Sequence, residues 1–87
     1  MSETLRIDKW LFHARFCKTR NIAQEKAEGG RIRLNGHRVE KASAAVRLGD
    51  VLTLPVGGKV VAVRVLQLGE RRGSATDART LYEVLED

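Results

Sequence analysis

Two cations flank a threonine where a helix is predicted to begin. Lys18, Thr19 and Arg20 directly precede a helical stretch, so their charge adds to that of the unpaired N–H groups at the amino end of the helix. Free N–H groups, the helix dipole and long cationic side chains all favour a bound anion. The pattern predicts a phosphate site at Lys18 and Arg20, whereas the alternative interpretation is a solvated basic turn.

Positive charge is concentrated in the first half of the chain. The formal net charge is +5, with eleven Lys and Arg against five Asp and Glu up to Arg47, and five against six from Leu48 onward. Such asymmetry is typical of a surface that binds a polyanion. Arginine can hold a phosphate through two hydrogen bonds or stack on an exposed base. We expect the surface to include six further cations, namely Arg6, Lys9, Arg15, Arg31, Arg33 and Arg38.

Two short helices are predicted to position these cations. The first should run from Asp8, which can cap it, to Phe16, and the second from a cap at Thr19 to Gly29-Gly30. Neither can bury much surface alone, so we expect them to pack on each other as a helix–turn–helix-like pair. Arg15 lies near the edge of the buried stripe of the first helix, where it could pair with Glu28 or Asp8 instead of a polyanion. The stripe is defined by spacing alone and comprises Ile7, Trp10, Leu11 and Ala14.

The hydrophobic period changes from helical to strand-like after the second helix. Ile32 and Leu34 alternate with arginines, and Asn35-Gly36 is a strong signal for a hairpin turn. This hairpin should have one apolar face and one arginine face. The tight turn would also let the backbone at Asn35 approach a phosphate. Two more strands are expected over 51–56 and 59–68, with a turn at Gly57-Gly58 and with Val61, Val63 and Val65 facing inward.

The end of the chain is predicted to form a third helix. Ser74 can cap it and Asp77 occupies the capping-box position. Its apolar face needs a partner, and Phe12 and Phe16 on the first helix are candidates. The same two rings next to cations could instead form a stacking platform for unpaired bases. The apolar face would consist of Ala78, Leu81, Tyr82 and Leu85.

Several function classes are disfavoured by the sequence. No apolar run approaches the roughly 20 residues of a membrane helix, and a single cysteine cannot form an internal disulfide. The first residues lack the apolar region of a secretory signal, so we expect a cytoplasmic protein. His13 and Cys17 are four residues apart but only His37 remains as a further soft ligand, so we expect neither metal nor cofactor. We also expect no catalysis, because no nucleophile has a plausible base.

The ordered motifs of the first half resemble a known family. The runs "RIDKWL", "RFCKTR" and "GGRIRLNG", with Ala23 between the last two, are similar to the RNA-binding domain of ribosomal protein S4, also called the alpha-L motif. Trp10 after Asp8-Lys9, together with "ERRGSATDARTLYE", resembles the heat shock protein 15 family, small bacterial proteins that bind RNA and the large ribosomal subunit. The resemblance implies an α+β fold in which an amino-terminal helix pair packs on a small, mostly antiparallel sheet, followed by a carboxy-terminal helix. We expect a single domain over 1–87, with the alpha-L core at 6–54 and a helical tail at 70–87.

The function implied by this resemblance is non-enzymatic binding of structured RNA. The RNA would be ribosomal, from the large subunit, and the protein would act in ribosome rescue or recycling under stress, as a monomer without membrane contact. Two other binding functions stay open: an adaptor that docks an acidic partner and presents Leu81 and Leu85, and DNA binding. An enzyme would have to depend on Cys17 and His13. The predicted RNA-binding residues are Arg6, Lys9, Arg15, Lys18, Thr19, Arg20, Arg31, Arg33, Asn35 and Arg38.

Overall fold

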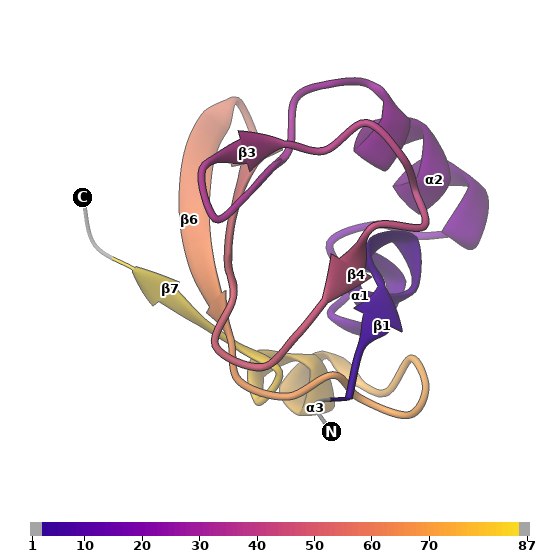
Figure 1. Cartoon of the computed structure of the whole chain (residues 1–87). Helices are drawn as coiled ribbons and strands as arrows, with labels where there is room; N and C mark the ends of the chain where they lie inside the picture. The colour runs from indigo at the N-terminus through magenta and orange to yellow at the C-terminus, as the bar shows by residue number, and fades with distance from the viewer. Residues whose placement is uncertain (1–2, 86–87) are drawn as a thin grey trace.

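The structure is a computed structural model that describes residues 3–85 (Figure 1). No helix in this described part is long and apolar enough to cross a membrane. Its three helices are α1 (Ile7–His13), α2 (Arg20–Glu28) and α3 (Ala75–Arg79). Its strands are β1 (Leu5–Arg6), β2 (Arg33–Leu34), β3 (His37–Arg38), β4 (Ala45–Val46), β5 (Val51–Val56), β6 (Lys59–Val65) and β7 (Tyr82–Leu85).

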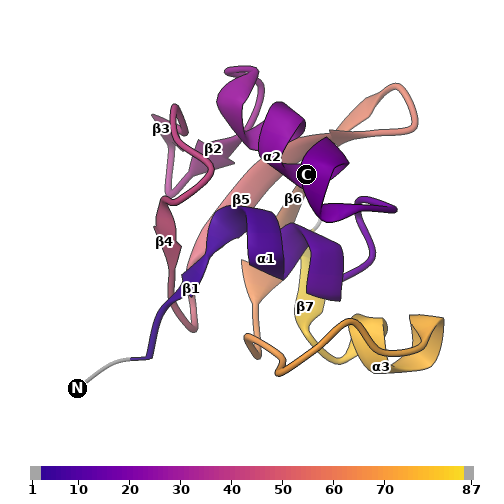
Figure 2. The ribbon, with the colours of Figure 1, turned by 90° about the vertical axis from the view of Figure 1, so that its right-hand side faces the viewer.

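The strands form two antiparallel sheets. Five strands pair in the order β3-β2-β5-β6-β7, and β1 pairs with β4 in a separate two-stranded sheet. Figure 2 shows α1 and α2 in front of the larger sheet, so the helix pair covers one of its faces. The predicted α+β fold, a helix pair on a mostly antiparallel sheet, is confirmed.

Helix α1 is fixed by its buried face. The four residues of the predicted stripe, Ile7, Trp10, Leu11 and Ala14, are all buried, and the Trp10 Nε1–H donates to the Gln67 carbonyl at 2.9 Å. The predicted bounds of 8–16 are wrong at both ends. Arg6, not Asp8, is the cap residue, and the helix ends at His13 because Arg15 adopts a φ of 62°, which no helix can continue through.

The predicted turn and cap residues adopt the conformations that their types favour. The Thr19 hydroxyl accepts a hydrogen bond from the Ile22 N–H at 3.1 Å and caps α2. Gly30, directly after α2, has a φ of 78°. Asn35 and Gly36 both have positive φ, at 52° and 86°, as the hairpin turn between β2 and β3 requires.

The larger sheet contributes alternate residues to the core. Leu52 and Leu54 of β5 are buried beneath the helices with Val63 and Val65 of β6, whereas Arg64 is exposed. This alternation follows from the strand period of two. The predicted inward face of 61–65 is therefore confirmed, with Val61 packed at its margin.

The predicted third helix is much shorter than expected. Ser74 and Asp77 form the predicted capping box, but α3 spans only five residues. Tyr82–Leu85 then pairs as β7 with β6, in the register Tyr82 to Val65 and Leu85 to Ala62. The open edge of β6 offers backbone hydrogen bonds that an isolated helical turn cannot match, so tertiary pairing overrides the helical spacing. Residues 86 and 87 of the predicted helical tail lie outside the described residues.

The aromatic residues of the first helix and its loop have different surroundings. Phe16 packs against Tyr82, with ring centroids 4.7 Å apart, and against Trp10 at 5.9 Å. Phe16 therefore packs on the tail as predicted, but it is only partly buried, and Tyr82 comes from a strand rather than a helix. Phe12 is partly exposed, and the Arg72 guanidinium lies 5.1 Å from the centre of its ring.

Candidate nucleic-acid interface

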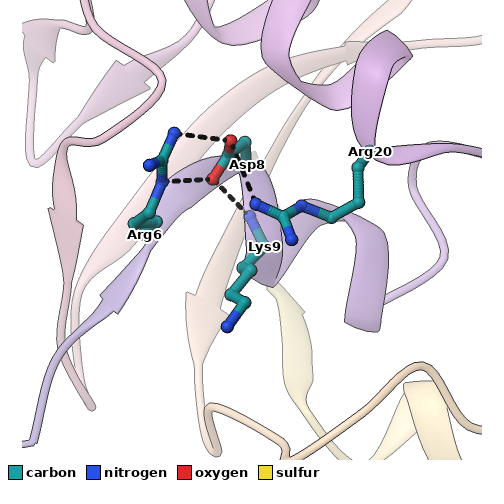
Figure 3. Close-up of polar contacts among 4 residues, drawn as sticks. All are labelled: Arg6, Asp8, Lys9 and Arg20. Atoms are coloured by element: carbon teal, nitrogen blue, oxygen red, sulfur yellow. Dashed lines mark hydrogen bonds and ion pairs between the residues drawn. The ribbon is translucent and has the colours of Figure 1, made fainter.

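A buried carboxylate lies between two of the predicted arginines. Asp8, in the first turn of α1, is 2% exposed. Its oxygens accept hydrogen bonds from Arg6 Nε at 3.1 Å and Arg6 Nη2 at 3.0 Å, and from the Lys9 backbone N–H at 2.7 Å. Arg20 Nη2 lies 3.6 Å from Asp8 Oδ2. Figure 3 shows the two arginines approaching Asp8 from opposite sides while the Lys9 side chain points away.

The Asp8 carboxylate is held in its charged form. Burial raises the pKa of Asp8, but hydrogen bonds from Arg6 and the Lys9 N–H, and the positive charges of Arg6 and Arg20, outweigh burial and leave it below the ordinary value of 3.8. A buried acid with this many donors stays ionised at neutral pH. Its charge therefore attracts both guanidinium groups under physiological conditions.

The two arginines retain donors that face solvent. Their side chains are 50% exposed for Arg6 and 44% exposed for Arg20, and each guanidinium has five N–H donors. Arg20 is the first residue of α2, so the N–H groups and dipole of this helix lie beside it. The Thr19 hydroxyl caps the helix by accepting the Ile22 N–H, and Lys18 next to it is exposed. We call Arg6, Lys18, Arg20 and Asp8 the carboxylate-centred cluster.

A second group of predicted arginines lies at the other end of α2. Arg33 of β2 and Arg38 of β3 are directly opposite each other in the hairpin, and the Arg38 side chain passes over Gly30, just beyond the helix. Arg31 lines a shallow groove with Glu25 and Lys26 of α2. All three arginines are exposed. We call Arg31, Arg33 and Arg38 the hairpin cluster.

Asn35 is occupied within the protein. Its side-chain Oδ1 accepts from the Val51 N–H at 2.9 Å, and its Nδ2 donates to Asp50 Oδ1 at 3.1 Å. Its backbone N–H donates to the Val51 carbonyl at 2.7 Å. The side chain and the backbone N–H of Asn35 therefore tie the hairpin turn to the start of β5, and a contact between Asn35 and RNA stays a prediction.

Arg15 belongs to neither cluster. Its Nη1 donates to the Gly73 carbonyl at 2.8 Å, so the side chain ties the end of α1 to the loop before α3. The alternative pairing with Glu28 or Asp8 that the sequence suggested is wrong, because the positive φ of Arg15 ends the helix and redirects its side chain. Within residues 3–85 the ion pairs link only Arg6 and Arg20 to Asp8.

The sequence interpretation missed the contacts of two residues, Asp8 and Arg72. Asp8 was expected to cap a helix, although an acid between the buried positions Ile7 and Trp10 and beside Arg6 was a signal for a buried ion pair. Arg72 was not expected to contact Phe12, because nothing in the run "ERRG" specifies which side chain it covers.

The two residues on which an enzyme would depend, His13 and Cys17, are both buried. His13 is buried, with Nδ1 3.4 Å from the Leu68 carbonyl. Cys17 is also buried, and burial raises the pKa of its thiol, with Lys26 opposing this effect, so the reactive thiolate is disfavoured. Among the residues that the structure describes, no three His, Cys, Asp or Glu side chains gather to hold a metal.

The fold and its helix pair define a known class of domain. The sequence profile of the S4 domain family matches residues 5–52, from β1 into β5. The chain belongs to the S4 domain family. Both clusters lie within the matched residues.

Particular relatives are similar over nearly the whole chain. Heat shock protein 15 homolog of Aeromonas salmonicida is 45% identical over 82 residues, which cover 94% of this chain and 61% of the relative. The RQC P-site tRNA stabilizing factor of Bacillus subtilis is 39% identical, with 95% and 94% covered. The trimeric structure of Vibrio cholerae heat shock protein 15 superposes with a TM-score of 0.89 at 37% identity, covering 95% of this chain and 83% of that one. The chain thus spans about three fifths of the length of the heat shock protein 15 homolog of Aeromonas salmonicida.

Proposed function

We propose that this protein binds structured RNA at the ribosome without catalysing a reaction. Membership of the S4 domain family and the charge of the first half support an RNA ligand. The Bacillus relative is named for stabilising a P-site tRNA, which supports a ribosomal setting. We further propose a cytoplasmic location, a site on RNA of the large subunit and a role in ribosome rescue or recycling under stress. The predicted monomer stays a prediction, since the Vibrio relative is trimeric in its solved structure.

The observation that carries this proposal is the carboxylate-centred cluster. Two half-exposed guanidinium groups lie beside the amino end of α2, where the helix itself favours an anion. Phosphate contacts supply most of the affinity of proteins that recognise RNA by charge and shape. The hairpin cluster extends the positive charge to the other end of α2. The ten sequence-predicted residues are thus proposed as RNA contacts with two amendments: Arg15 and the Asn35 side chain have partners within the protein.

The proposal is tested by a salt titration of a structured ribosomal RNA fragment. If roughly four to six phosphates are neutralised, the logarithm of the binding constant should fall against the logarithm of salt with a slope of about −3 to −5. Arg20→Gln should weaken binding by about 1 to 2 kcal/mol and reduce the slope by about one unit. Its effect on folding should stay below about 1 kcal/mol, because Gln keeps most of the stem.

Arg79→Gln is the matched control. Arg79 is an exposed cation of α3, outside the residues matched by the S4 profile. Equal weakening by the two substitutions would mean that binding reflects net charge alone. The same titration with DNA of equal length tests the DNA alternative, and nuclease treatment of a lysate tests the adaptor, because only a protein partner should stay attached.

A further inference from the structure

A negative charge in the middle of a proposed phosphate site needs a reason. Asp8 lies between Arg6 and Arg20, where its own charge repels a phosphate. Burying a carboxylate also costs free energy, which only good hydrogen bonds and charge partners offset. An apolar residue beside Ile7 and Trp10 would avoid both costs. The acid is therefore expected to contribute something that the arginines cannot supply alone.

The geometry of the three side chains indicates what Asp8 contributes. Arg6 comes from β1 and Arg20 from the start of α2, so they belong to different elements. Yet Nη2 of Arg6 and Nη2 of Arg20 lie 3.0 and 3.6 Å from the same oxygen, Asp8 Oδ2. Two guanidinium groups this close repel each other unless a negative charge separates them.

We propose that Asp8 is a positioning residue that holds Arg6 and Arg20 as one preorganised pair for an RNA phosphate. This inference rests on the proposed function. Asp8 does not touch the RNA. It engages Nε and Nη2 of Arg6 and Nη2 of Arg20, which leaves the remaining donors of both fork-shaped groups for the ligand. Because the side chains are ordered before binding, less conformational entropy is lost when the phosphate arrives.

The decisive substitution is Asp8→Asn, because the proposal and a model based on net charge predict opposite changes in the affinity for RNA. Asn removes a negative charge, so a binding model based on net charge predicts tighter binding to RNA. The proposal predicts binding about tenfold weaker, because the amide cannot hold two guanidinium groups together. Glu25→Gln removes the same charge from an exposed position on α2 and should leave binding unchanged or slightly tighter.

A second comparison separates positioning from a general structural role. Asp8→Asn is introduced into the double variant Arg6→Gln/Arg20→Gln, and affinity and melting temperature are measured for each protein. If Asp8 acts through the two arginines, its substitution should weaken binding no further in this background. An equal loss in both backgrounds would overturn the proposal, as would unchanged or tighter binding by Asp8→Asn in the otherwise native protein.

Arg6→Lys keeps the proposal testable if Asp8→Asn fails to fold. Lysine retains the charge and leaves Asp8 in place, but it cannot form the two parallel hydrogen bonds. Binding should weaken about fivefold with little change in melting temperature, since half of the Arg6 side chain is exposed. Full binding by Arg6→Lys would overturn the proposal. An unmodified protein that binds no RNA would refute the proposed function itself, which is a different outcome.

Discussion

The two ends of α2 have similar positive charge but hold it differently. At the amino end, Arg6 and Arg20 share the oxygens of the buried Asp8. At the carboxyl end, Arg33 of β2 and Arg38 of β3 are directly opposite each other in the hairpin. Among the described residues, no acid forms an ion pair with either arginine. The nine residues of α2, a helix about 13 Å long, lie between the two clusters.

This difference indicates a division of roles. An arginine fixed by a buried carboxylate has few conformations and can define where a phosphate binds. An exposed arginine opposite another arginine has no such restraint, and like charges in a cross-strand pair destabilise the hairpin. A surface that combines both has one rigid point and one adaptable point, which suits an RNA recognised by shape.

The largest expected effect comes from disrupting the packing of α1, the helix that carries Asp8 of the carboxylate-centred cluster. Trp10 is fully buried in α1 two residues after Asp8, and its indole N–H binds the Gln67 carbonyl. Trp10→Ala should lower the free energy of unfolding by about 3 to 5 kcal/mol, because it leaves a large cavity. Chemical denaturation followed by circular dichroism measures this. An unchanged midpoint would contradict the packing of α1 described above.

The next effect compares the two clusters through matched double variants. Arg6→Gln/Arg20→Gln and Arg33→Gln/Arg38→Gln each remove two cations, so each should reduce the salt slope by about two units. The loss of affinity should differ. The first pair should cost about 2 to 4 kcal/mol and the second about 1 to 2 kcal/mol, because only the first is preorganised. Titrations of one RNA fragment at several salt concentrations measure both quantities. Equal losses of affinity would remove the distinction between the clusters.

The charge of Asp8 gives a pH dependence confined to acid. Its folded-state pKa lies below the ordinary value of 3.8, so the unfolded chain takes up the proton first as pH falls. The resulting stabilisation is fully present above about pH 4 to 5 and is lost as pH falls below 3.8. The difference in unfolding free energy between the native protein and Asp8→Asn should be constant from pH 8 to about 5 and shrink in stronger acid. A difference that changes between pH 6 and 8 would contradict an ionised Asp8.

Local signals in the sequence were sufficient to predict much of the fold. The stripe of α1, the cap at Thr19 and the Asn35-Gly36 turn each depend on residues within a few positions of one another. The order of these motifs also predicted the family. Such features need no knowledge of what the rest of the chain does.

Features that depend on distant partners could not be predicted in this way. Tyr82–Leu85 has helical spacing, but the open edge of β6 makes it a strand. Arg15 contacts Gly73, which is far away in the sequence. Asp8 has the position of a helix cap, and only the packing of α1 against α2, which brings Arg20 to its carboxylate, makes it a shared ion-pair partner. The sequence therefore predicted which cations could contact RNA, and that stays a prediction, whereas the arrangement of these side chains could not be predicted.

The smallest expected effect is a gain in stability from a substitution in the hairpin cluster. Arg33 lies opposite Arg38, and like charges directly opposite each other in a sheet are destabilising. Arg33→Gln removes this repulsion while keeping most of the stem, so the unfolding free energy should rise by about 0.2 to 0.5 kcal/mol. For a domain of this size that corresponds to a melting temperature about 1 to 3 °C higher. The gain should shrink at about 1 M salt, where the screening length is only about 3 Å.

The control for this prediction is Lys59→Gln. Lys59 is an exposed cation of β6, paired with the uncharged Val56, so its substitution should leave the melting temperature within about 1 °C at either salt concentration. Arg33→Gln should weaken RNA binding at the same time, because Arg33 is proposed to contact a phosphate of the RNA. A protein that becomes more stable and loses affinity would show that the hairpin keeps its arginines for binding. Stabilisation with full affinity would exclude Arg33 from the RNA surface and leave the carboxylate-centred cluster as the main contact.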